Sequence, residues 1–207
     1  MTRLLRDYGE TLDGDTRTLL GQYRFVDLAR KVVGIGSVGT RTFIALLMGA
    51  GGDDPLFLQV KEAQPSVLEP YAGRSRFRHH GRRVIEGQWL MQAASDIFLG
   101  WLSAEDIDGV RRTFYLRQLW DWKLSPAIES MSAELLAGYA EICGWTLARA
   151  HARSGDRFAI AAYLGGGRAF DRAIAAFAEA YAAQNERDHA ALAAAAEQGR
   201  VEAEQGV

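Results

Sequence analysis

The chain has 207 residues, of which 24 are Lys or Arg and 26 are Asp or Glu, and its formal charge is -2. With 48% hydrophobic and 24% charged residues, it is not of the disordered, collagen-like or disulfide-scaffold class. The near-neutral charge argues against nucleic acid as a partner. Because no leader or membrane-spanning stretch is visible and Cys143 is the single cysteine, we expect no membrane contact and a cytoplasmic location.

Residues 1–24 predict short helices. Leu4, Leu5 and Tyr8 begin a series of apolar residues at spacings of three and four, which is the helical period. Asp13 followed by Gly14 interrupts the series. We treat these residues as a separate N-terminal helical segment.

Residues 25–123 predict a small sheet with one helix. Apolar runs over residues 42–48 and 56–60 have the length of strands, and Gly, Asp and Pro separate them. A helix is expected over residues 81–95, where apolar residues recur on one face. Two further strands are expected over residues 97–102 and 113–120.

Residues 124–207 predict a helical lobe. A long amphipathic helix is expected after Ser132, which is a good N-cap residue, and Cys143 falls in its apolar stripe, where we expect it to be buried. A second long, Ala-rich helix is expected from about Asp171. The predicted class is therefore α+β, with a small antiparallel sheet and one helix followed by an α-helical lobe.

Residues 34–39, Gly-Ile-Gly-Ser-Val-Gly, match the pattern G-x-G-x-x-G and are called the glycine loop below. Glycines at this spacing allow backbone N–H groups to approach phosphate oxygens, so Gly34, Gly36, Ser37 and Gly39 are candidate cofactor-binding residues. Gly is abundant at 22 residues, and a plain hairpin turn is the alternative.

The flanks of the glycine loop distinguish two kinds of nucleotide site. A dinucleotide-binding unit needs a helix that opens at the third Gly, with Glu62 as the acidic residue after the next strand. A kinase-type lobe needs the loop to join two antiparallel strands. Residues 40–48 are short and rich in strand formers, which favours the kinase type.

Lys61 is the candidate phosphate-binding cation. It follows the apolar residues 56–60, and a cation inside an apolar strand costs desolvation unless an anion pairs with it. The alternative is that Lys61 lies at a frayed strand end, in water beside Glu62. In kinases this Lys is held by a Glu on the following helix, for which Glu86 is the first candidate and Glu69 the second.

Phosphoryl transfer also needs an Asp to orient the acceptor and Asp or Asn side chains to hold Mg²⁺. The sequence contains no His-Arg-Asp-x-x-x-x-Asn and no Asp-Phe-Gly string. Residues 151–156 come closest, but they lack the Asn and also fit a helix C-terminus. We therefore expect nucleotide binding without transfer by the chain alone, and no metal site formed by protein ligands only.

Four strings together resemble the bacterial family called domain of unknown function 2252, namely residues 31–41, residues 56–63, residues 86–88 with 92–96, and residues 147–156. The resemblance covers nearly the whole chain and implies a protein-kinase-like or aminoglycoside-phosphotransferase-like fold. It also implies that Gly34, Gly36, Gly39 and Lys61 lie on the nucleotide side. We accordingly expect ATP with Mg²⁺ as the cofactor.

The sequence departs from longer family members, which resemble a permuted kinase and carry Gly-Asp-x-His and Asp-Phe-Asp strings ahead of the glycine loop. Nothing similar precedes Val32. The resemblance thus implies a truncated copy, corresponding to the C-terminal half, that is completed by a second polypeptide or by self-association. Phosphotransferase activity is expected only when it is completed. The alternatives are a non-catalytic interaction or regulatory module and, third, a dinucleotide-binding oxidoreductase.

Overall fold

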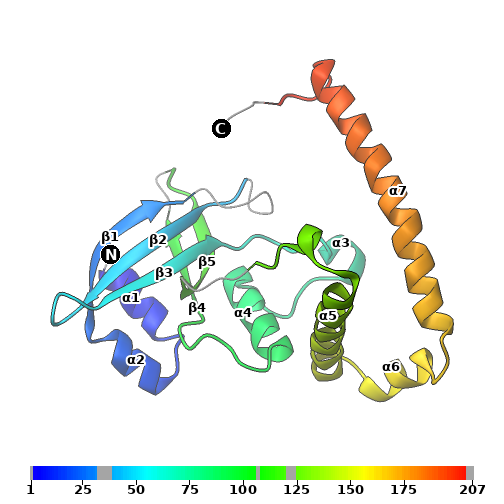
Figure 1. Cartoon of the computed structure of the whole chain (residues 1–207). Coiled ribbons are helices and arrows are strands. Elements are labelled where there is room, and N and C mark those ends of the chain that lie inside the picture. The colour runs from blue at the N-terminus through cyan, green and yellow to red at the C-terminus, as the bar shows by residue number, and fades with distance from the viewer. Residues whose placement is uncertain (1, 32–38, 106–107, 120–124, 204–207) are drawn as a thin grey trace. The chain divides into compact units, whose positions relative to one another are not determined.

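The structure is a computed structural model that describes residues 2–31, 39–105, 108–119 and 125–203. The chain divides into two compact units, Met1–Gly155 and Asp156–Val207, and each is described by itself (Figure 1). The first unit contains α1 (Thr2–Gly9), α2 (Gly14–Leu20), β1 (Tyr23–Arg30), β2 (Thr42–Gly49), β3 (Pro55–Glu62), α3 (Glu69–Ala72), α4 (His80–Met91), β4 (Gly100–Glu105), β5 (Arg111–Gln118), the 3-10 turn η2 (Ile128–Ser130) and α5 (Ala133–Ser154). The second contains α6 (Arg157–Leu164) and α7 (Ala169–Glu197).

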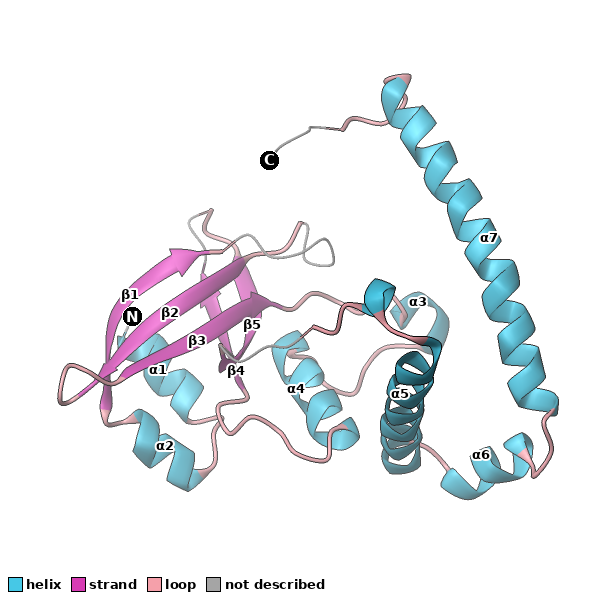
Figure 2. Ribbon diagram, viewed as in Figure 1, coloured by secondary structure: helices cyan, strands magenta, loops and turns pink. Residues whose placement is uncertain are grey.

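The five strands form one antiparallel sheet in the order β1-β2-β3-β5-β4 (Figure 2). The register shifts between Phe25 and Asp27, which leaves a bulge in the edge strand β1. Side chains alternate between the two sides of a strand. Paired residues share a side, so the register assigns each side chain to one face of the sheet.

The first face, called the α1 face below, carries the core of the unit. Leu47, Leu58 and Leu116 are buried there against Tyr8 and Leu12, which come from α1 and the turn after it. The Tyr8 hydroxyl donates a hydrogen bond of 2.6 Å to the carbonyl oxygen of Phe98. Burial raises the pKa of Tyr8 well above its ordinary value and keeps this donor protonated.

The second face, called the α4 face below, is covered by α4 over β4 and β5. His79 Nε2 lies 3.1 Å from the Ser103 hydroxyl, and the rings of Trp89 and Trp101 meet edge to face at 6.2 Å. Gly81 brings α4 close to β5, because a Cβ at this position would overlap the carbonyl oxygen of Phe114. A glycine is therefore required where the helix meets the sheet.

The structure confirms most of the predicted elements, counts against one alternative, contains one helix that was not predicted and corrects the expected burial of Cys143. Residues 42–49 form a strand, so the helix that a dinucleotide-binding unit requires after the third Gly is absent there. Helix α6 was not predicted, because it is only eight residues long. Cys143 is exposed instead of buried, because α5 contributes no buried residue to its unit.

Helix α5 has the N-cap that the sequence predicts, since the Ser132 hydroxyl accepts a hydrogen bond of 3.2 Å from the backbone N–H of Leu135. In the second unit, α7 begins within two residues of the predicted position. Large apolar side chains on both helices are exposed, among them Ile142, Trp145, Phe177 and Tyr181.

Candidate functional site

The glycine loop connects two strands that lie side by side in antiparallel orientation. Gly34, Gly36 and Ser37 lie outside the described residues. Immediately before the loop, the backbone N–H of Lys31 donates a hydrogen bond of 2.9 Å to the carbonyl oxygen of Thr42. Gly39 has a φ of +79°, a conformation that L side chains rarely adopt. Both ends of the connection are thus held next to the start of β2.

Lys61 lies on β3 directly beside that point. Its Cα is paired with that of Thr42 on one side and that of Tyr115 on the other. The side chain is half-buried and, by register, belongs to the α4 face. The start of β2, the exit of the glycine loop and the lysine therefore lie at one end of the sheet.

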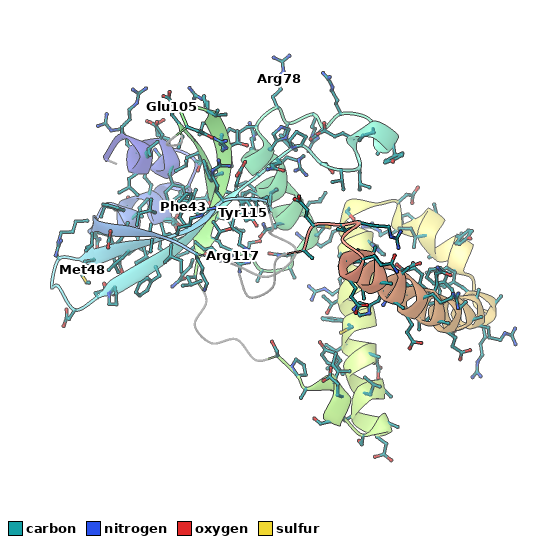
Figure 3. The ribbon with its side chains drawn as sticks, turned by 90° about the horizontal axis from the view of Figure 1, so that it is seen from above. Phe43, Met48, Arg78, Glu105, Tyr115 and Arg117 are labelled. Carbon is teal, nitrogen blue, oxygen red and sulfur yellow. The ribbon has the colours of Figure 1, made fainter. Side chains whose placement is uncertain are left out.

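Thr42 and Arg117 join this site, although the sequence analysis did not select them. Thr42 is 2% exposed, and within the described residues its hydroxyl oxygen has no hydrogen-bond partner. Arg117 on β5 is paired with the buried Gln59, two positions before Lys61 along β3 (Figure 3). The alternation of the predicted strand 113–120 was the available signal, because it puts Arg117 on the same side as Tyr115.

Glu86, the first candidate for the partner of Lys61, lies on α4. Its carboxylate is 3.0 Å from Nε of Arg82, one helical turn earlier. Such an exposed ion pair at a spacing of four contributes about 0.3–0.5 kcal/mol, which is weak enough to be exchanged for another cation. Glu69, the second candidate, is the first residue of the short helix α3.

Glu62 belongs to the opposite face from Lys61, because the two residues are consecutive on β3. Its side chain is 7% exposed and lies 3.4 Å from Arg41 and 3.6 Å from Arg112. Asp108 completes the cluster at 2.6 Å from Arg112, and hydrogen bonds from Arg112 and from the Val110 N–H lower the pKa of Asp108 to about 2. Glu62 is thus part of a cluster of ion pairs that also includes Arg41, Arg112 and Asp108.

The remaining phosphotransfer candidates, residues 151–156, lie at the end of α5 and the start of α6. His151 and Arg153 are in the last turn of α5, and Arg153 Nε donates to the Leu90 carbonyl oxygen at 2.9 Å. Asp156 is the N-cap of α6 and accepts hydrogen bonds from the N–H groups of Phe158 and Ala159 at 3.0 and 3.1 Å. In the described ranges, no three His, Cys, Asp or Glu side chains gather as metal ligands.

The basic stretch over residues 74–83 includes His79, whose ring makes two contacts within the protein. His79 caps α4, since its Nδ1 accepts a hydrogen bond of 3.2 Å from the Arg82 N–H. This bond and the contact with Ser103 fix the neutral tautomer with the proton on Nε2. Burial lowers the pKa of His79, which agrees with a neutral ring.

Comparison with known proteins gives one match. Residues 1–195 match a bacterial family described as "Uncharacterized protein conserved in bacteria (DUF2252)". No curated protein and no solved structure matches the chain. None of the helices in the described part of the chain is both long and apolar enough to cross a membrane. The match covers most of the sequence, so the chain belongs to the DUF2252 family of bacterial proteins.

Proposed function

We propose that the chain binds ATP with Mg²⁺ on the α4 face of its sheet, with Lys61 in contact with the phosphates. The observation that carries the proposal is the pairing of Lys61 with Thr42. The Cα of Lys61 is paired with that of the first residue of β2, the strand that follows the glycine loop. Protein kinases use the same order of parts, with a glycine loop over the phosphates, a lysine on the third strand and a glutamate on the next helix.

The chemistry of the neighbouring residues supports the same ligand. The ammonium group of the half-buried Lys61 is a positive charge of the kind that contacts phosphate oxygens. The unpartnered hydroxyl of Thr42 and the side chain of Arg117 belong to the same face. We include the glycine loop, with Gly34, Gly36, Ser37 and Gly39, and Glu86 as the residue that orients Lys61. Mg²⁺ would enter bound to the phosphate oxygens.

The proposal extends to the fold and is limited to binding. The two helices α3 and α4 between β3 and β4, the antiparallel sheet and the helices after it are consistent with a kinase-like arrangement. Phosphoryl transfer would require an Asp and metal-binding side chains from a second polypeptide or a second copy. We propose nucleotide binding, and not phosphoryl transfer, for the residues that the structure describes.

Thermal unfolding tests the proposal. ATP with Mg²⁺ at about a hundred times its dissociation constant adds about 2.7 kcal/mol of stability, which for this size raises the melting temperature by about 5–10 °C. Wild-type protein should show this rise. The variant Lys61→Met should lose it, because its side chain keeps the length but not the charge.

Lys31→Met is the matched control, since Lys31 is exposed just after β1, which is separated from the strand of Lys61 by β2. It should retain most of the ATP-induced rise. An equal loss in both variants would mean general charge attraction and would contradict the assignment to Lys61. A rise with NAD(H) alone would restore the dinucleotide alternative, although the strand at residues 42–49 already removes its principal support.

A second candidate function, a non-catalytic interaction module, is favoured by α5. This helix of 22 residues has no buried side chain in its unit, and large apolar residues such as Trp145 are exposed. Exposed apolar surface of this kind marks protein interaction sites. If neither ATP nor NAD(H) changes the melting temperature, this function replaces nucleotide binding.

A further inference from the structure

A cavity lined in part by basic side chains lies at the loop that precedes α4, apart from the proposed ATP site. Its volume is about 570 Å³, and it is lined by Pro65, Glu69, Arg74, Ser75, Phe77, Arg78 and His80. Figure 3 shows Arg78 on the loop before α4, well separated from Tyr115 and Arg117 of the sheet. Lys61, which is paired with Tyr115, does not line this cavity.

The five arginines of residues 74–83 divide into two groups. Three of them have partners within the protein. Arg76 stacks on Phe77 at 4.7 Å, Arg82 pairs with Glu86 at 3.0 Å, and Arg83 donates to the Gln64 carbonyl oxygen at 2.9 Å. These contacts hold the loop and the start of α4 in place.

Arg74 and Arg78 form the second group. Both are exposed and line the cavity, and within the described residues neither has an acidic partner. His80 lines the same cavity, and its Nδ1 is buried without a hydrogen-bond partner in the described part of the chain. A buried polar atom without a partner costs stability unless a ligand or water satisfies it. The side chains of Arg74 and Arg78 and the residue His80 therefore border one space.

We infer that this cavity binds a small phosphate monoester that also carries hydroxyl groups, the chemistry of a sugar phosphate. Guanidinium groups match phosphate oxygens in charge and geometry, and Arg74 and Arg78 supply two of them in one wall. Glu69 is the one carboxylate in the wall, and it can accept a hydrogen bond from a ligand hydroxyl. The side of the Phe77 ring supplies an apolar wall for the carbon skeleton.

A nucleic-acid backbone is the competing ligand, and the observations favour the small molecule. A polyanion would be expected to contact all five arginines of the loop. Three of the five already have partners inside the protein. The net charge of -2 also gives the chain no wide positive field. The inference does not depend on the ATP proposal, because none of the residues is shared.

Titration calorimetry of the full chain with glucose 6-phosphate tests the inference, with glucose and inorganic phosphate as separate titrants. We expect saturable binding of glucose 6-phosphate, weaker binding of inorganic phosphate and none of glucose. Arg78→Gln and Arg74→Gln should each weaken the binding at least tenfold. Arg76→Gln, in the same loop and with the same loss of charge, should change it less than threefold, because Arg76 does not line the cavity.

Three results would overturn the inference. One is the absence of saturable binding of glucose 6-phosphate, and another is an equal loss for Arg76→Gln and Arg78→Gln. Binding of a short single-stranded RNA that all three variants weaken alike would assign the surface to nucleic acid. Unchanged melting temperatures of the ligand-free variants confirm that they fold.

The two sites are separated by crossing the variants. Lys61→Met should bind glucose 6-phosphate as the wild type does, and Arg78→Gln should keep the rise in melting temperature with ATP and Mg²⁺. If each variant abolishes both effects, the cavity is not a separate site and the inference fails.

Discussion

The sheet and helix α5 have apolar patterns of similar strength in the sequence but very different burial. Leu58 on β3 is 0% exposed, whereas Leu147 on α5 is 58% exposed. Each strand finds neighbours through backbone hydrogen bonds within one sheet, and α1 and α2 then cover one side. A single helix forms its backbone hydrogen bonds within itself, so these bonds do not bring another surface against its apolar side chains. The periodicity of apolar residues thus indicates the type of element, and burial depends on a partner surface.

The largest expected effect on stability comes from comparing a buried leucine of the sheet with an exposed leucine of α5. Leu58→Ala should lower the free energy of unfolding by about 2–5 kcal/mol, because it leaves a cavity in the core. Leu147→Ala should lower it by less than about 0.5 kcal/mol, because the side chain is exposed. Denaturant unfolding followed by circular dichroism measures both. A large loss for Leu147→Ala would mean that another surface covers α5 in solution.

A smaller effect on stability is expected for two glycines of α4, a helix that packs on the sheet. Gly81→Ala should lower the free energy of unfolding by about 1–3 kcal/mol, since the new Cβ would lie 2.7 Å from the Phe114 carbonyl carbon. Gly87→Ala on the same helix meets nothing within 4 Å and should raise it by about 0.5–1 kcal/mol. The same denaturation curves give both values. Equal effects would show that α4 does not pack closely on β5.

The smallest effect concerns the ion cluster of the sheet, which has no counterpart among the described side chains of α5, α6 and α7. The pKa of Asp108 is lowered from 3.8 to about 2, chiefly by hydrogen bonds from Arg112. Its stabilising contribution is therefore complete above about pH 4 and is lost as the pH falls toward 2. The difference in melting temperature between wild type and Asp108→Asn should shrink over that range. A difference that stays constant would contradict this.

Much of the fold could be predicted, because spacing reports the period of an element. The strands at 42–48 and 56–60 and the helices after Ser132 and near Asp171 appear close to their expected positions. Helix α6 was missed because it has only eight residues and starts two positions after Gly155, although Asp156 as an N-cap was the available signal. Burial of Cys143 was wrongly expected because a stripe on a helix does not reveal what covers it.

The candidate site could be predicted in part. The strand position of Lys61 and the helix that carries Glu86 follow from apolar runs and their order. The pairing of Lys61 with Thr42 and the position of Arg117 depend on strand register, which the sequence alone does not specify. The separation of Arg74 and Arg78 from their neighbouring arginines depends on side-chain contacts made only in the folded loop.

The bulge in β1 limits how this protein can associate. An uninterrupted outer strand offers a continuous row of backbone donors and acceptors to which a further strand can add, and this is a route to unwanted fibrils. In β1 the offset at Val26 divides that row into two short runs. A polypeptide that joins this protein at β1 would therefore contact side chains, and extension of the sheet at that edge is disfavoured.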